Sequence, residues 1–198
     1  MTAYLIATID VHDAEGYEEY KNKVPALIEK QGGRYIVRGG DRDTVEGTWP
    51  DGRIVVLEFP DLASANAFAD DPEYVPVAAI RHRTTTSHIW IVEGPEGGAN
   101  ADGKHAYILG NIEMTEPDGY KPYAEQVPAI MEAAQGAYLA RGGAARSVEG
   151  GMALDRVVIV AFADMQAARA FYDGGDYTAI KPIRIAASDS NIVIVEGL

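Results

Sequence analysis

The sequence contains no cysteine, so disulfide bonds, thiolate nucleophiles and thiolate metal ligands are all excluded. No apolar run approaches the roughly 20 residues that a membrane-spanning helix needs, and residues 1–6 show no signal-peptide pattern. Basic residues are few: 17 Lys and Arg stand against 30 Asp and Glu, for a formal net charge of −13. This charge repels nucleic acid and anionic membranes, and no Lys/Arg cluster offsets it. We therefore expect a cytoplasmic protein with neither nucleic-acid nor membrane partners.

An internal repeat organises the chain. Three short motifs recur without a gap 103 residues later: Arg38-Gly39-Gly40, Val45-Glu46-Gly47 and Arg53 return as Arg141-Gly142-Gly143, Val148-Glu149-Gly150 and Arg156. A repeat of this length predicts two copies of one structural unit. We place the first repeat at residues 1–94, a linker at 95–105 and the second repeat at 106–198, because residues 95–104 have linker composition and no periodicity.

The hydrophobic pattern predicts the same elements in each repeat. In the first, residues 4–11 have strand composition, and residues 14–31 carry apolar side chains at the spacing of an amphipathic helix. Pro25 interrupts that helix and predicts a kink or break near Val24. Strands are expected at 34–40, 53–59 and 87–93, with a helix at 61–70 and a shorter helical piece at 73–81. The order is β-α-β-β-α-β, a ferredoxin-like arrangement.

The expected fold class is α+β, with two tandem ferredoxin-like repeats. Helices cover one face of each antiparallel sheet and leave the other face open. An open apolar face must be buried, and the twin repeat supplies the partner. We therefore expect the two sheets to face each other in an intramolecular dimeric α/β-barrel around a pseudo-two-fold axis. The particle is expected to be a monomer containing this internal pseudo-dimer, or a homodimer of it.

Several motifs together resemble the family DUF1330, a domain of unknown function in the dimeric α/β-barrel superfamily. They are Tyr17-x-x-Tyr20, the run Gly32 to Gly40, Val45-Glu46-Gly47, Arg53, and Tyr74 followed by Arg81. Typical members are single domains that dimerise, so the resemblance implies a covalent version of that dimer. The superfamily includes cofactor-free monooxygenases, muconolactone isomerase-like enzymes, polyketide cyclases and stress-response proteins, which use the cavity between sheet and helices. The fold alone does not choose among these activities.

Arginine and glutamate are the first candidates for a site. Arg38 with Glu46, and Arg141 with Glu149, can clamp a substrate carboxylate, with the glutamate holding the arginine or acting as a base. The alternative is a structural ion pair that braces the loop between two strands. The duplicated arginines Arg53, Arg156, Arg81 and Arg184 can likewise bind an anion or bridge element ends.

Tyrosine is the second candidate. Eight tyrosines recur in the two repeats, and Tyr20, Tyr74, Tyr123 and Tyr177 are expected to bind substrate or donate a proton to it. The alternative is that they belong to the core and have capped hydroxyls.

The repeats also differ, and polarity is concentrated in the first. His12, His82 and His88 become Thr115, Ile185 and Asn191; Glu58 becomes Ala161; Trp49 and Trp90 become Met152 and Val193. Glu58 and His88 lie on neighbouring predicted strands, so we expect them to form an acid–base pair in a first-repeat pocket with Trp49. The alternative places Glu58 at the sheet edge. His82, His88 and Glu58 lack metal-ligand spacing, so no metal and no other cofactor is expected.

These features predict a cofactor-free enzyme of the isomerase, lyase or cyclase type. Its substrate is a small oxygenated or carboxylated organic molecule in a cavity lined by Arg, Tyr and Glu. An arginine or tyrosine stabilises the developing oxyanion while a glutamate or histidine moves the proton. The alternatives are a protein that binds or sequesters a small ligand, and a purely structural building block.

Overall fold

The computed structural model describes residues 1–151 and 154–198, and both halves fold into the same series of elements. The first half contains β1 (Ala3–Val11), α1 (Ala14–Lys30), β2 (Arg34–Arg38), β3 (Arg42–Glu46), β4 (Arg53–Phe59), α2 (Leu62–Ala69), α3 (Tyr74–Thr84) and β5 (Thr85–Glu93). The second contains β6 (Ala106–Met114), α4 (Pro117–Ala133), β7 (Ala137–Arg141), β8 (Ala145–Glu149), β9 (Arg156–Phe162), α5 (Met165–Asp173), α6 (Gly175–Ala187) and β10 (Ser188–Glu196). The predicted order is confirmed, with β3 and β8 as additional strands.

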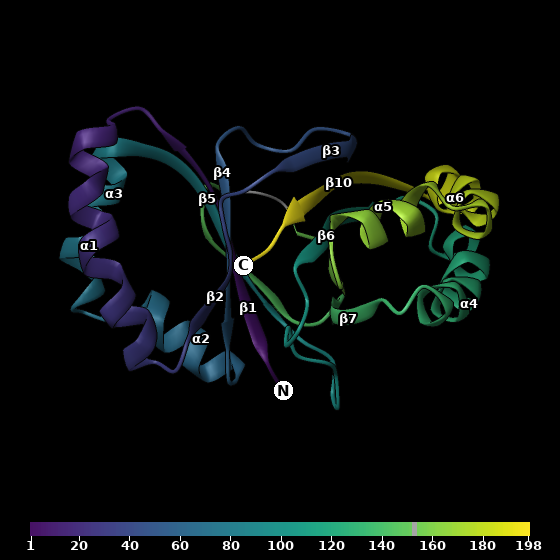
Figure 1. Cartoon of the computed structure of the whole chain (residues 1–198), viewed down its shortest axis with the longest axis horizontal. Coiled ribbons are helices and arrows are strands. Elements are labelled where there is room, and N and C mark those ends of the chain that lie inside the picture. Colours follow the sequence, from purple (N-terminus) through teal and green to yellow (C-terminus); the bar gives the residue numbers. More distant parts are fainter. Residues whose placement is uncertain (152–153) are drawn as a thin grey trace.

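These two additional strands are exchanged between the halves. Strand β3 pairs antiparallel with β10, and β8 pairs antiparallel with β5. The first sheet therefore has the order β2-β4-β1-β5-β8, and the second has the order β3-β10-β6-β9-β7. Figure 1 shows β3 lying beside β10, away from the helices of its own half. Each sheet is thus completed by a fifth strand from the other repeat.

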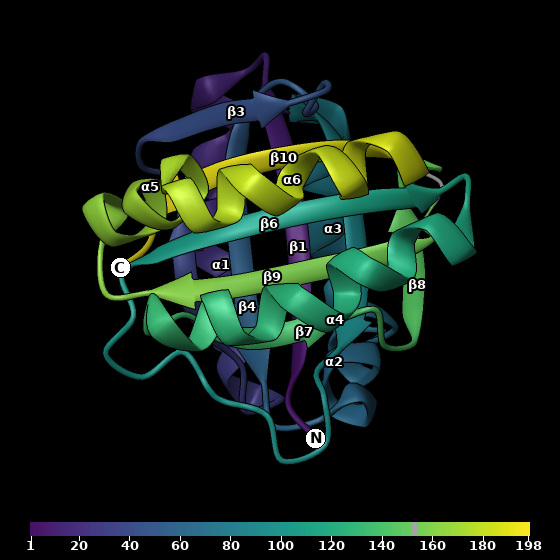
Figure 2. The same ribbon diagram turned by 90° about the vertical axis from the view of Figure 1, so that its right-hand side faces the viewer.

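The two sheets pack face to face, which confirms the intramolecular α/β-barrel. In Figure 2 the strands of the second sheet run across those of the first. The core between the sheets takes side chains from both halves, including Tyr4, Trp90, Tyr107, Leu109 and Ile159, all at most 1% exposed. Successive side chains of a strand point to opposite faces, so each sheet keeps its other face for its helices. The cavity for a ligand therefore has to be sought on the helix side.

Helices α1–α3 cover the outer face of the first sheet, and α4–α6 cover that of the second (Figure 1). Helix α1 buries Tyr17, Tyr20, Val24 and Ile28, which are spaced by three and four residues and so share one helix face. Of the kink or break expected near Val24, the break does not occur, since α1 runs from Ala14 to Lys30 with Pro25 inside it. Packing of this apolar face against the sheet outweighs the local cost of the proline.

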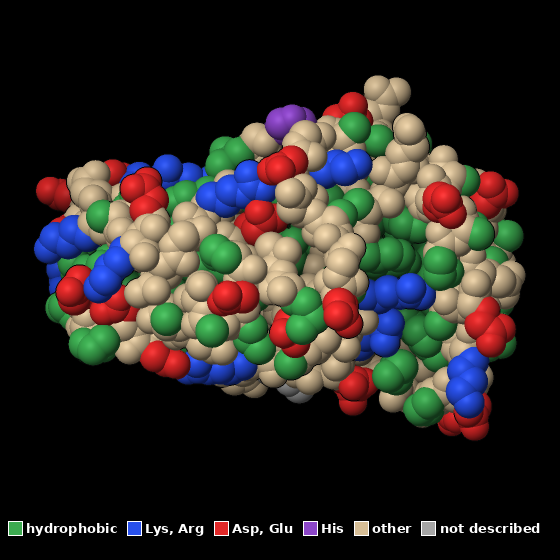
Figure 3. All heavy atoms as spheres, turned by 90° about the horizontal axis from the view of Figure 1, so that it is seen from below, with side chains coloured by type: hydrophobic (Ala, Val, Ile, Leu, Met, Phe, Trp, Pro, Cys, Tyr) green, Lys and Arg blue, Asp and Glu red, His purple; other side chains and the backbone are tan. Residues whose placement is uncertain are grey.

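Charged side chains are dispersed on the surface in Figure 3. Acidic and basic groups lie there among apolar and neutral ones, without a large patch of one sign. Within the described ranges, no helix has both the length and the hydropathy needed to cross a membrane.

Candidate functional site

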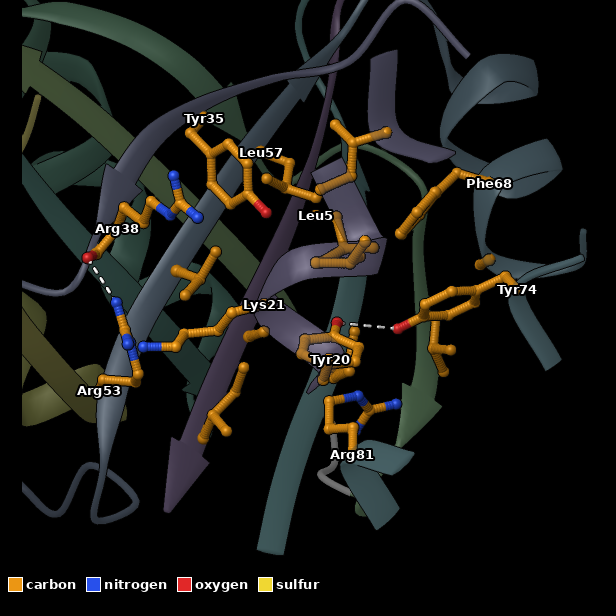
Figure 4. Close-up of a pocket in the computed structure, with 18 of the residues that line it drawn as sticks. Leu5, Tyr20, Lys21, Tyr35, Arg38, Arg53, Leu57, Phe68, Tyr74 and Arg81 are labelled. Atoms are coloured by element: carbon orange, nitrogen blue, oxygen red, sulfur yellow. Dashed lines mark hydrogen bonds between the residues drawn. The ribbon is translucent and has the colours of Figure 1, made fainter. Parts of the chain in front are cut away.

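A pocket opens between the outer face of the first sheet and helices α1–α3. It contains about 660 Å³ outside the protein atoms, part of it open to solvent. Strands β1, β4 and β5 supply apolar side chains such as Leu5, Val55 and Ile89, and the helices and β2 supply tyrosines and cations. We call this space the first pocket. Figure 4 shows Lys21, Arg38 and Arg53 toward one end, and Tyr20, Tyr74 and Arg81 toward the other.

The outer end of the first pocket carries three cations: Lys21 of α1, Arg38 of β2 and Arg53 of β4. Arg53 Nη2 donates a hydrogen bond to the carbonyl oxygen of Arg38 at 2.7 Å, and the Arg38 guanidinium lies 4.6 Å from the centroid of the Tyr35 ring. Lys21 Nζ lies 2.5 Å from a carboxylate oxygen of Glu18. Among the described residues, neither arginine forms an ion pair with a carboxylate, and Arg53 Nε is buried without a partner. This end of the pocket is therefore positively charged, although the chain as a whole is strongly acidic.

The inner end combines tyrosines with a buried ion pair. The hydroxyls of Tyr20 and Tyr74 are hydrogen-bonded at 3.2 Å (Figure 4). Arg81, only 2% exposed, donates two hydrogen bonds of 2.7 Å to the two carboxylate oxygens of Glu149. Glu149 belongs to β8 of the second repeat, and its Oε2 also lies 2.9 Å from Nε2 of His82. The second repeat thus supplies the carboxylate that neutralises Arg81 of the first pocket.

Burial keeps the pocket phenols protonated. It raises the pKa of Tyr20 well above its usual value, a shift strengthened by Tyr74, and it raises the pKa of Tyr35 to about 12 although the nearby Arg38 opposes the shift. The pKa of Tyr17 is raised for the same reason. These hydroxyls are therefore hydrogen-bond donors at neutral pH and not bases.

This arrangement predicts a delayed tyrosine titration. The fold favours the protonated phenol, so the stability gained is complete below the unfolded pKa of 10.0 and is lost as the pH rises through the folded value of about 12. A near-ultraviolet titration is expected to show less tyrosinate in the native protein than in the urea-unfolded chain, which titrates near pH 10. Identical curves for the native and unfolded protein would contradict this assignment.

The equivalent space of the second repeat is divided. An inner cavity of about 410 Å³ is lined by Tyr123, Tyr177 and Arg184, and an outer one of about 300 Å³ is lined by Arg141 and Arg156. Every residue lining the first pocket except Val148 has its counterpart, 103 residues away, in one of these two cavities. The predicted arginines and tyrosines of both repeats therefore do meet around helix-side cavities.

The predicted pairing of Arg38 with Glu46, and of Arg141 with Glu149, is wrong. Strand exchange carries each glutamate to the other half, where Glu46 accepts hydrogen bonds from Arg184 and Tyr172. Arg141 instead donates to a backbone carbonyl of α4 at 3.2 Å. The glutamates therefore hold the buried arginines of α3 and α6, and within residues 1–151 and 154–198 the outer arginines have no carboxylate partner.

Glu58 and His88 do not form the predicted acid–base pair. Glu58 lies opposite Tyr4 of β1 and His88 lies opposite Thr8, so four residues, or about 13 Å of strand, separate them along the sheet. Both are on the inter-sheet face, away from the first pocket. Glu58 accepts a hydrogen bond of 2.8 Å from Arg34 and another from the linker backbone, which gives it a structural contact.

Trp49 does not line the first pocket either. It is buried in the inter-sheet core, donates from Nε1 to Thr8 Oγ1 at 3.1 Å and lies 5.9 Å from the Trp90 ring. Its counterpart in the repeat, Met152, lies outside the described residues.

Two features of the pocket were missed in the sequence. Lys21 lies at the cationic end, but its counterpart Ala124 is uncharged, so a search for residues shared by both repeats passes over it. Ala69 lines the first pocket where the second repeat has Tyr172. Aligning the two repeats at their offset of 103 residues pairs Ala69 with Tyr172. Comparing small residues as well as polar ones would therefore have found this difference.

The pocket offers few ligands for a metal or haem. In the part of the chain that is described, no group of three His, Asp or Glu side chains is placed to hold a metal ion. Among the described residues that line the first pocket there is no histidine, aspartate or glutamate, and Glu149 and His82 at the inner end are bound to Arg81 and to each other. Its polar chemistry consists of guanidinium, ammonium and phenol groups, which bind oxygen anions.

Two ferredoxin-like units whose sheets pack face to face, with cavities under their helices, define a dimeric α/β-barrel protein, here formed by one chain. The chain belongs to the family described as a domain of unknown function, DUF1330, whose family model matches it twice, at residues 2–95 and 105–198. The resemblance seen in the sequence is thereby confirmed. No curated protein matches the chain in sequence.

Solved structures share the fold over the whole chain. A proposed monooxygenase from Lactobacillus acidophilus is 8% identical with a TM-score of 0.54, covering 100% of this chain and 98% of its own. A mutant chlorite dismutase from Candidatus Nitrospira defluvii is 10% identical with a TM-score of 0.54, covering 98% and 91%. A haem-binding protein from Thermus thermophilus is 11% identical with a TM-score of 0.54, covering 100% and 91%. At such identities the likeness shows the fold and not the function.

Proposed function

We propose that the first pocket binds a small, mostly apolar organic molecule that carries one anionic oxygen group. The observation that carries this proposal is the pair Arg38 and Arg53, which have no carboxylate partner in the described residues of a chain with 30 Asp and Glu. An arginine without a counter-ion beside an apolar cavity favours a carboxylate, enolate or phenolate. The similar folds named above include a haem-binding protein and a proposed monooxygenase, which supports a small-molecule role in general.

The apolar floor sets the rest of the ligand. Leu5, Val55, Leu57, Phe68 and Ile89 line the pocket. An apolar or aromatic body of the ligand is stabilised there by about 25 cal/mol for each Å² removed from water. A highly charged or sugar-like ligand would leave polar groups without partners on this floor.

A second candidate is the cofactor-free enzyme of the isomerase, lyase or cyclase type. The protonated phenol of Tyr35 lies beside Arg38, and these two donors are suited to a developing oxyanion at the outer end. The protonated phenol of Tyr20 is a further donor at the inner end. The described residues that line the pocket include no carboxylate or imidazole, and Glu149, which is bound to Arg81 at the inner end, has a lowered pKa and is therefore a weak base. Glu58 and His88 lie on the other face of the sheet. Binding is therefore the better supported of the two functions.

Calorimetric titration with a carboxylate and its neutral amide tests the binding proposal. We expect 3-phenylpropionate to bind once per chain, at least about tenfold more tightly than 3-phenylpropanamide, since a hydrogen bond to a charged group contributes about 1.5–3 kcal/mol. Added salt is expected to weaken the binding of the carboxylate but not that of the amide. Equal affinities for the two compounds, or no binding of the carboxylate, would overturn the proposal.

The enzyme candidate is separated from pure binding by Tyr20→Phe. This change removes a donor while keeping the ring, so an enzyme is expected to keep its affinity and lose turnover of its substrate by about 100-fold or more. The variants Glu58→Gln and His88→Asn are the controls, because their side chains face away from the pocket. Loss of turnover in these controls with full activity in Tyr20→Phe would rule out the pocket as the catalytic site.

A further inference from the structure

One position distinguishes the two repeats at the inner end of their cavities. The last residue of α2, Ala69, lines the first pocket, and its counterpart in the second repeat is Tyr172 of α5. The residues around this position are otherwise matched: Phe68 with Phe171, Tyr74 with Tyr177, and Arg81 with Arg184. A phenol side chain thus occupies, in the second repeat, a place that a methyl group leaves open in the first.

Tyr172 is held as a bound phenol would be. Its hydroxyl donates a hydrogen bond to Glu46 Oε1, the same oxygen that accepts from Arg184. Its ring lies 5.6 Å from the ring of Tyr177, and the ammonium of Lys181 lies 4.1 Å from its centroid. A ring, a hydroxyl and an acceptor for that hydroxyl are all present.

The first pocket has the same acceptor without the phenol. Glu149 is bound by Arg81 as Glu46 is bound by Arg184, and Glu149 Oε1 accepts one hydrogen bond, so it has a lone pair to spare. The Glu149 side chain is 26% exposed, whereas that of Glu46 beneath Tyr172 is 16% exposed. The pocket is also one space from Ala69 to Arg38, whereas the equivalent space of the second repeat consists of two smaller cavities whose linings share Tyr123 and Tyr138.

We propose that Tyr172 is a built-in substitute for the ligand, and that the first pocket takes a hydroxyaryl carboxylate, whose phenol ring lies beside Ala69. The ligand's hydroxyl donates to Glu149, and its carboxylate lies among Lys21, Arg38 and Arg53. This inference rests on the proposed function and adds the chemistry of the inner end. The two ends of the pocket set the orientation of the ligand, because Glu149 at the inner end accepts a hydrogen bond from the neutral hydroxyl and repels the carboxylate.

The test compares 3-(4-hydroxyphenyl)propionate with 3-phenylpropionate by calorimetric titration of the full chain. We expect the hydroxyl to tighten binding about tenfold or more, as a hydrogen bond to a charged acceptor does. In Ala69→Tyr the new side chain fills the inner end, so both compounds are expected to bind at least about 100-fold more weakly. The comparison of the two compounds on the unmodified protein stands even where a variant fails to fold.

Tyr172 provides the converse experiment, with p-cresol as the probe. Native protein is expected to bind one p-cresol at the inner end of the first pocket, and Tyr172→Ala is expected to bind two. Tyr172→Phe, which keeps the ring, is the matched control and is expected to bind one. A crystal soaked with p-cresol locates each molecule.

The outcomes separate this inference from the proposed function. If 3-phenylpropionate binds but the hydroxyl adds nothing and Ala69→Tyr binds normally, the hydroxyaryl inference is wrong and the anion site stands. If neither carboxylate binds, the proposed function fails and this inference fails with it. If p-cresol enters Tyr172→Ala but not the first pocket of native protein, Tyr172 is only a core residue.

Discussion

Replacing Glu149 by alanine is expected to lower the free energy of unfolding by about 3 kcal/mol, the largest stability change that we predict. The reason is that Arg81 is 2% exposed and that both of the hydrogen bonds it donates to carboxylate oxygens go to this residue. Removing Glu149 leaves a buried guanidinium without a counter-ion. For a chain of this size the melting temperature should fall by roughly 6–12 °C.

An exposed pair provides the control for this measurement. The carboxylate of Glu19 pairs with Arg83 Nη2 at 3.0 Å and with Lys23 Nζ at 2.7 Å, and all three side chains are about half exposed, so Glu19→Ala is expected to cost much less stability than Glu149→Ala. Combining Glu149→Leu with Arg81→Met removes both charges and is expected to recover most of the loss. Equal, small effects of Glu149→Ala and Glu19→Ala in urea unfolding would show that the exchanged strand β8 does not neutralise Arg81.

The same pair makes stability depend on pH. Burial alone would raise the pKa of Glu149, but the hydrogen bonds from Arg81 outweigh it and lower the pKa below 4.5. The contribution of the Arg81–Glu149 pair to stability is therefore complete above the unfolded pKa of 4.5 and is lost as the pH falls through the lower pKa of the folded state. Glu149→Gln is expected to be less stable than the native protein at neutral pH and to lose less of its stability on acidification.

Replacing Arg38 and Arg53 together by alanine is expected to weaken binding of 3-phenylpropionate by about 100-fold. Each arginine can donate charge-assisted hydrogen bonds worth about 1.5 kcal/mol or more, and about 3 kcal/mol corresponds to this loss. Neither arginine has a carboxylate partner to leave unpaired in the described structure, so the fold should tolerate the change. Calorimetric titration gives the affinity, and thermal unfolding checks the stability.

The second repeat offers a matched control for the arginine pair. Arg141 and Arg156 are the counterparts of Arg38 and Arg53, but their cavity is separated from the inner space that Tyr172 fills. Replacing both by alanine removes the same charge and is expected to leave the affinity unchanged. A similar loss in both double variants would mean that net charge, and not the first pocket, determines binding.

Local sequence patterns predicted the element order because each element has a local cause. Alternating and periodic apolar residues marked β1, α1, β4 and β5, and the observed bounds of β4 match the predicted range 53–59. The repeat predicted the elements of the second half, and the need to bury the open face of each sheet predicted the barrel. Pro25 was the exception, because tertiary packing overrides a local preference.

The strand exchange could not be predicted from local pattern. Strands β3 and β8 are five residues long, lie at sheet edges and have no buried residues, so they carry no alternation of buried and exposed positions. Their partners lie far away in the sequence: Glu46 pairs with Ile192. Assigning Glu46 to Arg38 was the natural choice over a short loop, and it failed because the strand leaves its own half.

The residue types of the site were predictable, but their partners were not. Arginines and tyrosines such as Arg81 and Tyr74 recur at a fixed offset and do line cavities. Glu58 and His88 were paired by neighbouring strands without the register, which separates them along β1. The register of a strand depends on the whole sheet and cannot be predicted from the sequence of that strand alone.

Chemical-shift mapping by NMR of the full chain with 3-phenylpropionate locates the ligand on the protein. We expect one saturable site whose shifted amides lie in α1, β2, β4 and the α2–α3 segment, with none in α4–α6. Shifts confined to the second repeat or to the inter-sheet face, or no saturable shifts at all, would contradict it.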